Sequence, residues 1–326
     1  MATKNNPAMA NGEFGFIEKI KKLFGATEGL VGIGDDCAVI PMGESDLLVT
    51  TDMLIEGIHF LRSDATPEQV GYKSVAVNLS DIAAMGGRPI GTFLSIALPK
   101  DAQGKWAERF MEGFAEISRH YGVPLLGGDT TSSLRDVAVN VAVVGTCPHG
   151  GAILRSGARV GDTIFVTGPL GDSGAGLKLL LERAERTPDE DFLVERHYIP
   201  TPRLGEGLSL AATGLVGAMM DISDGIASDL GHILKASGVG ARIELDALPT
   251  SEQLQRVCGR KGWSAFEIAA SAGEDYELLL TAPEEITQMV DFPLYPIGKI
   301  IDGGAEIEWH KDGQRCNFTT HGFTHF

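Results

Sequence analysis

Long apolar stretches are absent from this sequence. No run approaches the roughly 18 consecutive apolar residues that a membrane-spanning helix requires. The first residues, MATKNNPAMANGEF, also lack the apolar core of a signal peptide. We therefore expect a cytoplasmic protein that has no membrane partner.

Cysteine is scarce and widely spaced. The chain has four cysteines, Cys37, Cys147, Cys258 and Cys316, and no Cys-x-x-Cys pair. This spacing argues against a zinc ribbon and against a dithiol redox motif. We expect reduced cysteines, several of them buried.

Basic residues are outnumbered throughout the chain. The 27 Lys and Arg face 44 Asp and Glu, giving a formal net charge of -17, and no basic block stands out. Such a protein repels nucleic acids and anionic membrane surfaces, because both carry the same sign of charge. We therefore predict no nucleic-acid partner.

Several well-known nucleotide and calcium motifs are also missing. The sequence has no Gly-x-x-x-x-Gly-Lys-[Ser/Thr] loop, no His-Arg-Asp catalytic loop and no Asp-x-Asp-x-Asp-Gly loop. Their absence argues against a Walker-type ATPase, a protein kinase and a calcium-loop protein of the usual kind. The stretch GPLGDSGAG before a predicted helix could hold a phosphate group or could form only a tight turn.

The length and the residue pattern predict an α/β protein. At 326 residues the chain is longer than one typical domain. We predict two domains, residues 1–150 and 151–326, joined at the glycine-rich stretch CPHGGAILRSGARVG. A helix is expected over residues 67–84, with Thr66 before it and Pro67 at its first position. VPLLGGDTT is expected to form a buried strand that ends in two glycines, an aspartate and two threonines.

Carboxylates and hydroxyls recur at glycine-rich turns and at the ends of predicted elements. The candidate oxygen ligands are Asp36, Thr50, Thr51, Asp52, Asp81, Asp129, Asp221, Asp224 and Glu274. A single cluster such as Gly-Asp-Asp could be only a turn, and N-capping by Ser223 or Asp224 could account for one acidic residue of the segment 221–229, but not for all three. If the clusters converge, cations must compensate their repulsion. Oxygen ligands suit Mg²⁺ or Ca²⁺, so both a phosphoryl-transfer enzyme and a calcium-stabilised binding protein stay open.

Six motifs in order carry a resemblance. GIGDDCAV, TTDMLIEGIHF, NLSDIAAMGG, GGDTT, DISDGIASDLGHI and GEDYELL resemble those of thiamine-monophosphate kinases, in the superfamily of aminoimidazole ribonucleotide synthetase and selenophosphate synthetase. The resemblance implies an N-terminal α/β domain with a dimerising sheet, followed by a C-terminal α/β domain. It further implies a homodimer that uses ATP and several Mg²⁺ ions to phosphorylate thiamine monophosphate. The alternative within this superfamily is a sibling resembling aminoimidazole ribonucleotide synthetase.

The resemblance also implies roles for individual residues. Metal ligands would be Asp36, Thr50, Thr51, Asp52, Asp81, Asp129, Asp221 and Asp224. ATP would contact Tyr121, Gly128, Asp129, Arg155 and Ser223, and thiamine monophosphate would contact His59, Glu274 and Phe323. A lone histidine such as His59 is more often structural than functional when only its type is considered. The expected chemistry is direct in-line transfer without a covalent intermediate, supported by Asp81, Asp129 and Asp224.

Overall fold

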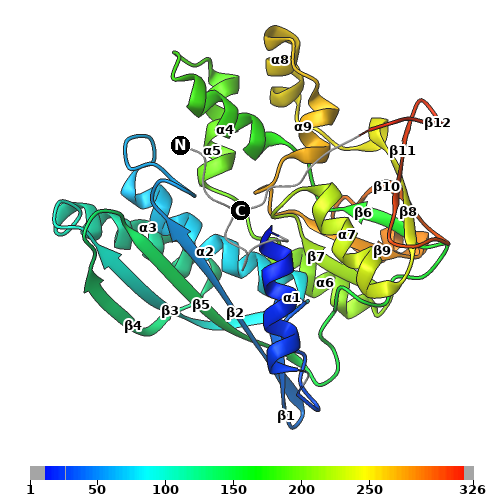
Figure 1. Cartoon of the computed structure of the whole chain (residues 1–326), viewed down its shortest axis with the longest axis horizontal. Coiled ribbons are helices and arrows are strands. Elements are labelled where there is room, and N and C mark those ends of the chain that lie inside the picture. The colour runs from blue at the N-terminus through cyan, green and yellow to red at the C-terminus, as the bar shows by residue number, and fades with distance from the viewer. Residues whose placement is uncertain (1–11, 26, 319–326) are drawn as a thin grey trace.

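Two mixed sheets and a set of helices make up the computed structural model, which describes residues 12–25 and 27–318 (Figure 1). The helices are α1 (Gly12–Phe24), α2 (Pro67–Ala84), α3 (Lys105–Tyr121), α4 (Asp172–Glu182), α5 (Pro188–Tyr198), α6 (Leu204–Thr213), α7 (Ile226–Ser237), α8 (Glu252–Lys261) and α9 (Ala265–Ser271), with short 3-10 helices at Leu245–Ala247 and Glu284–Gln288. The strands are β1 (Ala38–Met42), β2 (Ser45–Ile55), β3 (Arg88–Leu98), β4 (Leu125–Ser132), β5 (Ala138–Pro148), β6 (Thr163–Val166), β7 (Ala218–Asp221), β8 (Gly240–Glu244), β9 (Leu278–Ala282), β10 (Tyr295–Ile301), β11 (Ile307–Lys311) and β12 (Gln314–Arg315). This architecture confirms the predicted α/β class.

The first sheet has the strand order β1-β2-β5-β3-β4. Strands β2 and β5 pair antiparallel along their whole length, from Ser45 opposite Pro148 to Ile55 opposite Ala138. Only the β3–β4 pair is parallel in this sheet. Strand β4 therefore lies at one edge, and β2 lies three strand spacings away from it.

The second sheet has the strand order β12-β11-β8-β10-β6-β9-β7. Adjacent strands in this sheet are antiparallel, except β8 and β11, which are parallel. Strand β7 forms the edge and ends at Asp221, so the loop that follows emerges beside the first half of the chain.

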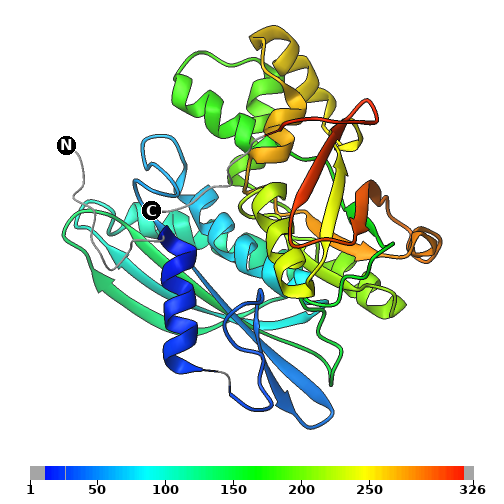
Figure 2. The same ribbon diagram turned by 45° about the vertical axis from the view of Figure 1, so that its right-hand side comes forward.

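Helix α2 connects the two halves. It lies between the first sheet and the second half of the chain and contacts β2, β5, α6 and β7 (Figures 1 and 2). A capping box begins it: the Thr66 hydroxyl accepts a hydrogen bond from the Gln69 N–H, and the Gln69 side chain accepts one from the Thr66 N–H. The bounds Pro67–Ala84 confirm the predicted helix. Because α2 is buried on most sides, any polar group along it needs a partner inside the protein.

Two hydrophobic clusters hold the chain together. The first includes Leu48 under α2 and extends to Phe165 and Leu193 in the second half. The second lies between α7 and the second sheet, around Ile164 and Leu230. Since the first cluster crosses residue 150, the two halves share part of a core, and the domain boundary near 150 stays a prediction.

Three of the sequence-based expectations can be compared directly with these elements. The cysteines are free, and Cys37, Cys147 and Cys258 are buried, as expected. No helix in the described part of the chain is long and apolar enough to cross a membrane. The expectation of a buried strand in VPLLGGDTT was wrong: every residue of β4 is exposed, because the strand lies at the sheet edge.

Candidate active site

A cavity of about 920 Å³ opens where the two halves meet. Its walls come from β2, α2, α4, the loop after β7 and the loop before β9. The lining side chains include Asp52, Ile58, His59, Val77, Asp81, Ser173, Leu177, His197, Asp221, Ser223, Asp224, Glu274 and Tyr276. The cavity is therefore lined by both acidic and aliphatic side chains, and we call the part at Asp81 and Asp221 its acidic part.

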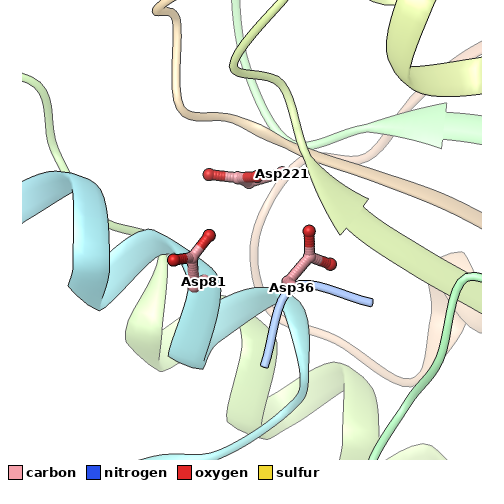
Figure 3. Close-up of side chains that lie close together, drawn as sticks. All are labelled: Asp36, Asp81 and Asp221. Carbon is pink, nitrogen blue, oxygen red and sulfur yellow. The ribbon is translucent and has the colours of Figure 1, made fainter. Parts of the chain in front are cut away.

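Three carboxylates from separate elements meet at the acidic part. Asp36 precedes β1, Asp81 lies near the C-terminal end of α2, and Asp221 ends β7. One oxygen atom of each lies within 4.8 Å of the others, and the three groups face a shared space (Figure 3). Oxygen ligands at this spacing fit a hard divalent cation such as Mg²⁺ or Ca²⁺.

Strand β2 adds two further groups. Thr50 and Asp52 share the strand face that α2 covers, because side chains alternate along a strand. The Thr50 hydroxyl donates a hydrogen bond to Asp81 Oδ2, and the nearby charge of Asp52 raises the pKa of Asp81. The Asn78 side chain accepts a hydrogen bond from the Asp52 N–H at 3.1 Å. These contacts fix the strand against the helix at the carboxylate cluster.

The cluster resists ionisation. Burial raises the pKa of Asp221 to about 8, with a further contribution from Asp36. Burial, followed by the charges of Asp52, Asp221 and Asp36, raises the pKa of Asp81 well above its ordinary value. Burial likewise raises the pKa of Asp36, although the neighbouring Arg155 opposes the rise. A bound cation would favour the ionised carboxylates and remove this cost.

One cation of the protein touches the cluster. The Arg155 guanidinium donates a hydrogen bond to Asp36 Oδ1, and the Arg155 backbone N–H donates one to Asp35 Oδ1 at 2.6 Å. The second oxygen, Asp36 Oδ2, is buried and lacks a hydrogen-bond partner within the described chain. A buried carboxylate oxygen without a partner is expensive, so this atom is a ready ligand for a metal ion.

The loop between β7 and α7 presents Ser223 and Asp224 to the cavity. Neither side chain caps α7. The Asp229 carboxylate instead accepts hydrogen bonds from the N–H groups of Asp224 and Gly225, at 3.1 and 3.0 Å. The expectation that Ser223 or Asp224 caps this helix was therefore wrong. Both Ser223 and Asp224 line the cavity.

Glu274 and His59 also line the cavity. Glu274 has a left-handed backbone with φ of 62°. Its Oε1 lies 3.0 Å from the Lys73 ammonium, and its Oε2 lies 3.3 Å from His197 Nδ1. His59 Nδ1 accepts a hydrogen bond from the Ile55 N–H at 3.0 Å, so its ring proton lies on Nε2.

Ser173, His197 and Glu274 do not form a nucleophilic triad. Both Ser173 Oγ, at 3.0 Å, and Glu274 Oε2 lie against the same ring atom, His197 Nδ1. A triad uses both ring nitrogens, one for the nucleophile and one for the carboxylate. Burial, aided by Lys73, lowers the pKa of His197 to about 3, so the ring is neutral.

The glycine-rich loop before α4 does not present an open anion site. The Asp275 carboxylate accepts hydrogen bonds from the N–H groups of Gly171 and Ser173 at the start of that helix, at 2.6 and 3.2 Å. An internal carboxylate thus occupies the position that a phosphate group would take. Of the two interpretations of GPLGDSGAG, a phosphate-binding loop or only a tight turn, the structure fits the tight turn.

Several predicted site residues lie apart from the cluster. Gly128 and Asp129 are on the exposed edge strand β4, three strand spacings, roughly 14 Å, from β2. Thr51 points to the sheet face opposite Thr50, where it accepts a hydrogen bond from the Asn140 side chain at 2.8 Å. The Tyr121 hydroxyl donates a hydrogen bond to the Pro202 carbonyl. Phe323 lies outside the described residues.

Sequence reasoning missed other residues of the site, among them Ser173, His197 and Tyr276 in the cavity lining and the buried Lys73 behind it. The signal for Lys73 was present: Lys73, Val77 and Asp81 are spaced by four residues and so share one helix face. No comparable local pattern marks His197, because it reaches the cavity from α5 through the tertiary fold.

Known proteins are similar to this chain along most of its length. Residues 34–147 match the family model of the AIR synthase related protein N-terminal domain, and residues 159–310 match that of the C-terminal domain. The thiamine-monophosphate kinase of Salmonella typhimurium is 39% identical over 330 residues, covering 98% of this chain and 99% of that protein. That of Aquifex aeolicus is 42% identical over 275 residues, covering 84% of this chain and 87% of that protein.

A solved structure is also similar along nearly the whole chain. The structure of AaThiL complexed with AMPPCP and TMP has a TM-score of 0.88 and 37% sequence identity, and the match covers 99% of both chains. It supports the two-domain α/β fold for the chain described above. The ligands AMPPCP and TMP belong to that structure.

Proposed function

This chain belongs to the thiamine-monophosphate kinase family, and from that premise we propose that it transfers the γ-phosphoryl group of ATP to the phosphate of thiamine monophosphate, giving thiamine diphosphate. The observation that carries the proposal is the meeting of Asp36, Asp81 and Asp221 at a cavity that aliphatic side chains also line. Two anionic substrates can approach each other there only when cations offset the charge of both substrates and protein.

The proposed cations are Mg²⁺ ions, several per site. Asp36, Thr50, Asp52, Asp81 and Asp221 would hold them on the covered face of β2, and Asp224 would reach them from the loop after β7. The partnerless oxygen of Asp36 and the raised pKa values of the cluster fit this role. Bound Mg²⁺ offsets the negative charge that the phosphate groups bring together.

The reaction needs little proton transfer from the protein. The acceptor phosphate is already an oxyanion, so a general base is dispensable and no covalent intermediate is required. The protein's part is to hold two phosphate groups in line, which makes positioning the main source of acceleration. Asp81 and Asp224 border the space where these groups would meet, and Asp129 is proposed to support the ATP side.

We place the organic part of thiamine monophosphate against the aliphatic side chains of the cavity. His59 and Glu274 supply polar contacts, and Ile58 and Leu177 supply an aliphatic surface. Phe323 is proposed to stack on the substrate. ATP would contact Arg155 and Ser223.

The remaining ATP contacts, Tyr121, Gly128 and Asp129, lie away from this cavity within one chain. We propose that the protein is a homodimer paired through the first sheet, with ATP bound near the interface. The edge strand β4 is exposed along its length, and Phe93, Leu125 and Leu126 on β3 and β4 are at least 41% exposed. Unpaired edges of this kind favour association with another chain.

The test uses purified protein, ATP and Mg²⁺, with thiamine monophosphate, free thiamine and formylglycinamidine ribonucleotide offered separately. ATP consumption and thiamine diphosphate formation only with the first supports the proposal. Turnover with formylglycinamidine ribonucleotide would indicate the sibling activity instead. A Ca²⁺-dependent rise in melting temperature without any turnover would favour a calcium-stabilised binding protein.

A further inference from the structure

A buried lysine stands behind the cavity wall. Lys73 lies on α2, and its side chain is only 2% exposed. Its ammonium lies 3.0 Å from Glu274 Oε1, and within the described chain Nζ makes no hydrogen bond that meets ordinary geometric limits. Burying an ammonium with a single partner is costly, so its position needs an explanation beyond packing.

The backbone N–H and both carboxylate oxygens of Glu274 have partners in the protein. Its N–H donates a hydrogen bond to the Ser223 carbonyl at 2.8 Å. A Cβ atom on the preceding Gly273 would come within 2.2 Å of the same carbonyl oxygen, so only glycine permits this close approach. Lys73 and His197 contact its two carboxylate oxygens. The side chain is 27% exposed toward the cavity, so it offers substrate a carboxylate whose orientation is fixed.

The contacts that Lys73 and His197 make with Glu274 differ in charge. His197 is neutral and can offer at most one hydrogen bond through Nδ1, which it shares with Ser173. Lys73 carries the positive charge. Burial raises the pKa of Glu274, but the Lys73 ammonium is the largest opposing influence, and the pKa stays below its ordinary value. The carboxylate therefore stays ionised beside an acidic cluster, mainly because of Lys73.

We propose that Lys73 is a positioning residue for the thiamine monophosphate site: it orients Glu274, which then accepts hydrogen bonds from the organic part of the substrate. This inference rests on the proposed function. A merely structural ion pair would affect folding and both substrates alike. A positioning residue affects thiamine monophosphate selectively, because ATP is placed at the acidic end of the cavity.

The test is Lys73→Met, which keeps the length and apolar stem of the side chain. We expect KM for thiamine monophosphate to rise about tenfold or more, the scale of losing an oriented charged hydrogen bond, with KM for ATP and kcat within about threefold of the parent. Lys261→Met is the matched control, because it removes another lysine–glutamate pair, 2.7 Å to Glu182, away from the cavity. It should leave both KM values unchanged.

Lys73→Met leaves a buried carboxylate without its partner and could prevent folding. Lys73→Met/Glu274→Gln removes both charges, and we expect it to fold and to bind a non-hydrolysable ATP analogue normally, with thiamine monophosphate binding weakened about tenfold or more in calorimetry. Parent-like thiamine monophosphate binding in either folded variant, or an equal loss for both substrates, would overturn the inference. A parent protein that does not phosphorylate thiamine monophosphate would instead overturn the proposed function, and this inference with it.

Discussion

The Thr50 hydroxyl on β2 donates a hydrogen bond to the Asp81 carboxylate on α2, joining residues 31 positions apart. The bond favours the ionised form of a carboxylate whose pKa is raised by burial and by three acidic neighbours. Strand and helix thus hold a charge that the surrounding protein disfavours. A buried carboxylate with a strongly raised pKa is typical of functional sites, including those that bind a cation.

Asp81→Asn should have opposite effects on stability and on activity. Without metal it removes one of the repelling carboxylates, so the free energy of unfolding should rise by about 1 kcal/mol or more. Turnover should fall at least about 100-fold, because a metal ligand is lost. Thermal unfolding in EDTA and steady-state kinetics at limiting Mg²⁺ measure the two effects.

Asp189→Asn provides the control for this prediction. Asp189 is paired with Arg256 and Arg260 outside the cavity, and its replacement should leave turnover unchanged. Asp224→Asn should also abolish turnover without unfolding the protein. Near-normal turnover in both Asp81→Asn and Asp224→Asn at limiting Mg²⁺ would contradict the multi-metal site.

Stability without metal should fall as the pH rises from 6 to 8. The pKa of Asp221 is raised from 3.8 to about 8, mainly by burial, and that of Asp275 is raised to about 8 for the same main reason. Between these values the folded protein holds protons that the unfolded chain has released. The free energy of unfolding therefore decreases with pH, by at most about 1.4 kcal/mol per pH unit for each group, and levels off above pH 8.

Adding Mg²⁺ should distinguish the contribution of Asp221 to this pH dependence of stability from that of Asp275. Asp221 faces the metal cluster, so saturating Mg²⁺ should remove its share of the slope. Asp275 is bound to the N–H groups of Gly171 and Ser173, and its share should persist with Mg²⁺ and disappear in Asp275→Asn. Denaturant unfolding at several pH values, with and without Mg²⁺, tests this. An unchanged slope on adding Mg²⁺ would argue against metal at Asp221.

The sequence predicted the parts of the site that depend on local pattern. The bounds of α2 follow from Thr66, Pro67 and the capping box, and the acids at element ends do meet, since Asp36, Asp81 and Asp221 lie together. The position of β4 was missed, because whether an apolar strand lies at an edge depends on the strand order of the whole sheet.

Other parts of the site depend on contacts between distant segments. Asp229 rather than Asp224 binds the N–H groups before α7, a choice that local N-cap preferences do not specify. Asp275 fills the helix start after the glycine-rich loop from more than 100 positions away. A pattern within a few residues contains no information on such pairings.

Leu126→Lys should separate the proposed dimer. Leu126 is 54% exposed on the edge strand β4, and a lysine at an unpaired edge opposes association with another strand. We expect light scattering after gel filtration to change from dimer to monomer, with weaker binding of an ATP analogue because Gly128 and Asp129 share this strand. Leu181→Lys, at a 68% exposed position on α4, should change neither result. A Leu126→Lys protein that remains fully dimeric would place the interface elsewhere.

Gly128→Ala should be far more disruptive than Gly127→Ala, although the two glycines are adjacent. A Cβ atom at Gly128 would lie 1.8 Å from the Leu94 carbonyl oxygen, whereas one at Gly127 would meet only the Phe93 ring at 3.6 Å, an ordinary contact. Backbone cannot give way as a flexible side chain can, so β4 must shift away from β3. We expect Gly128→Ala to cost about 3 kcal/mol or more in the free energy of unfolding, and Gly127→Ala to change it by less than about 1 kcal/mol. Because Gly128 and Asp129 are proposed to contact ATP, the KM for ATP should rise in Gly128→Ala and stay near the parent value in Gly127→Ala. Equal unfolding curves for the two variants would show that β4 does not pair with β3 as closely as described.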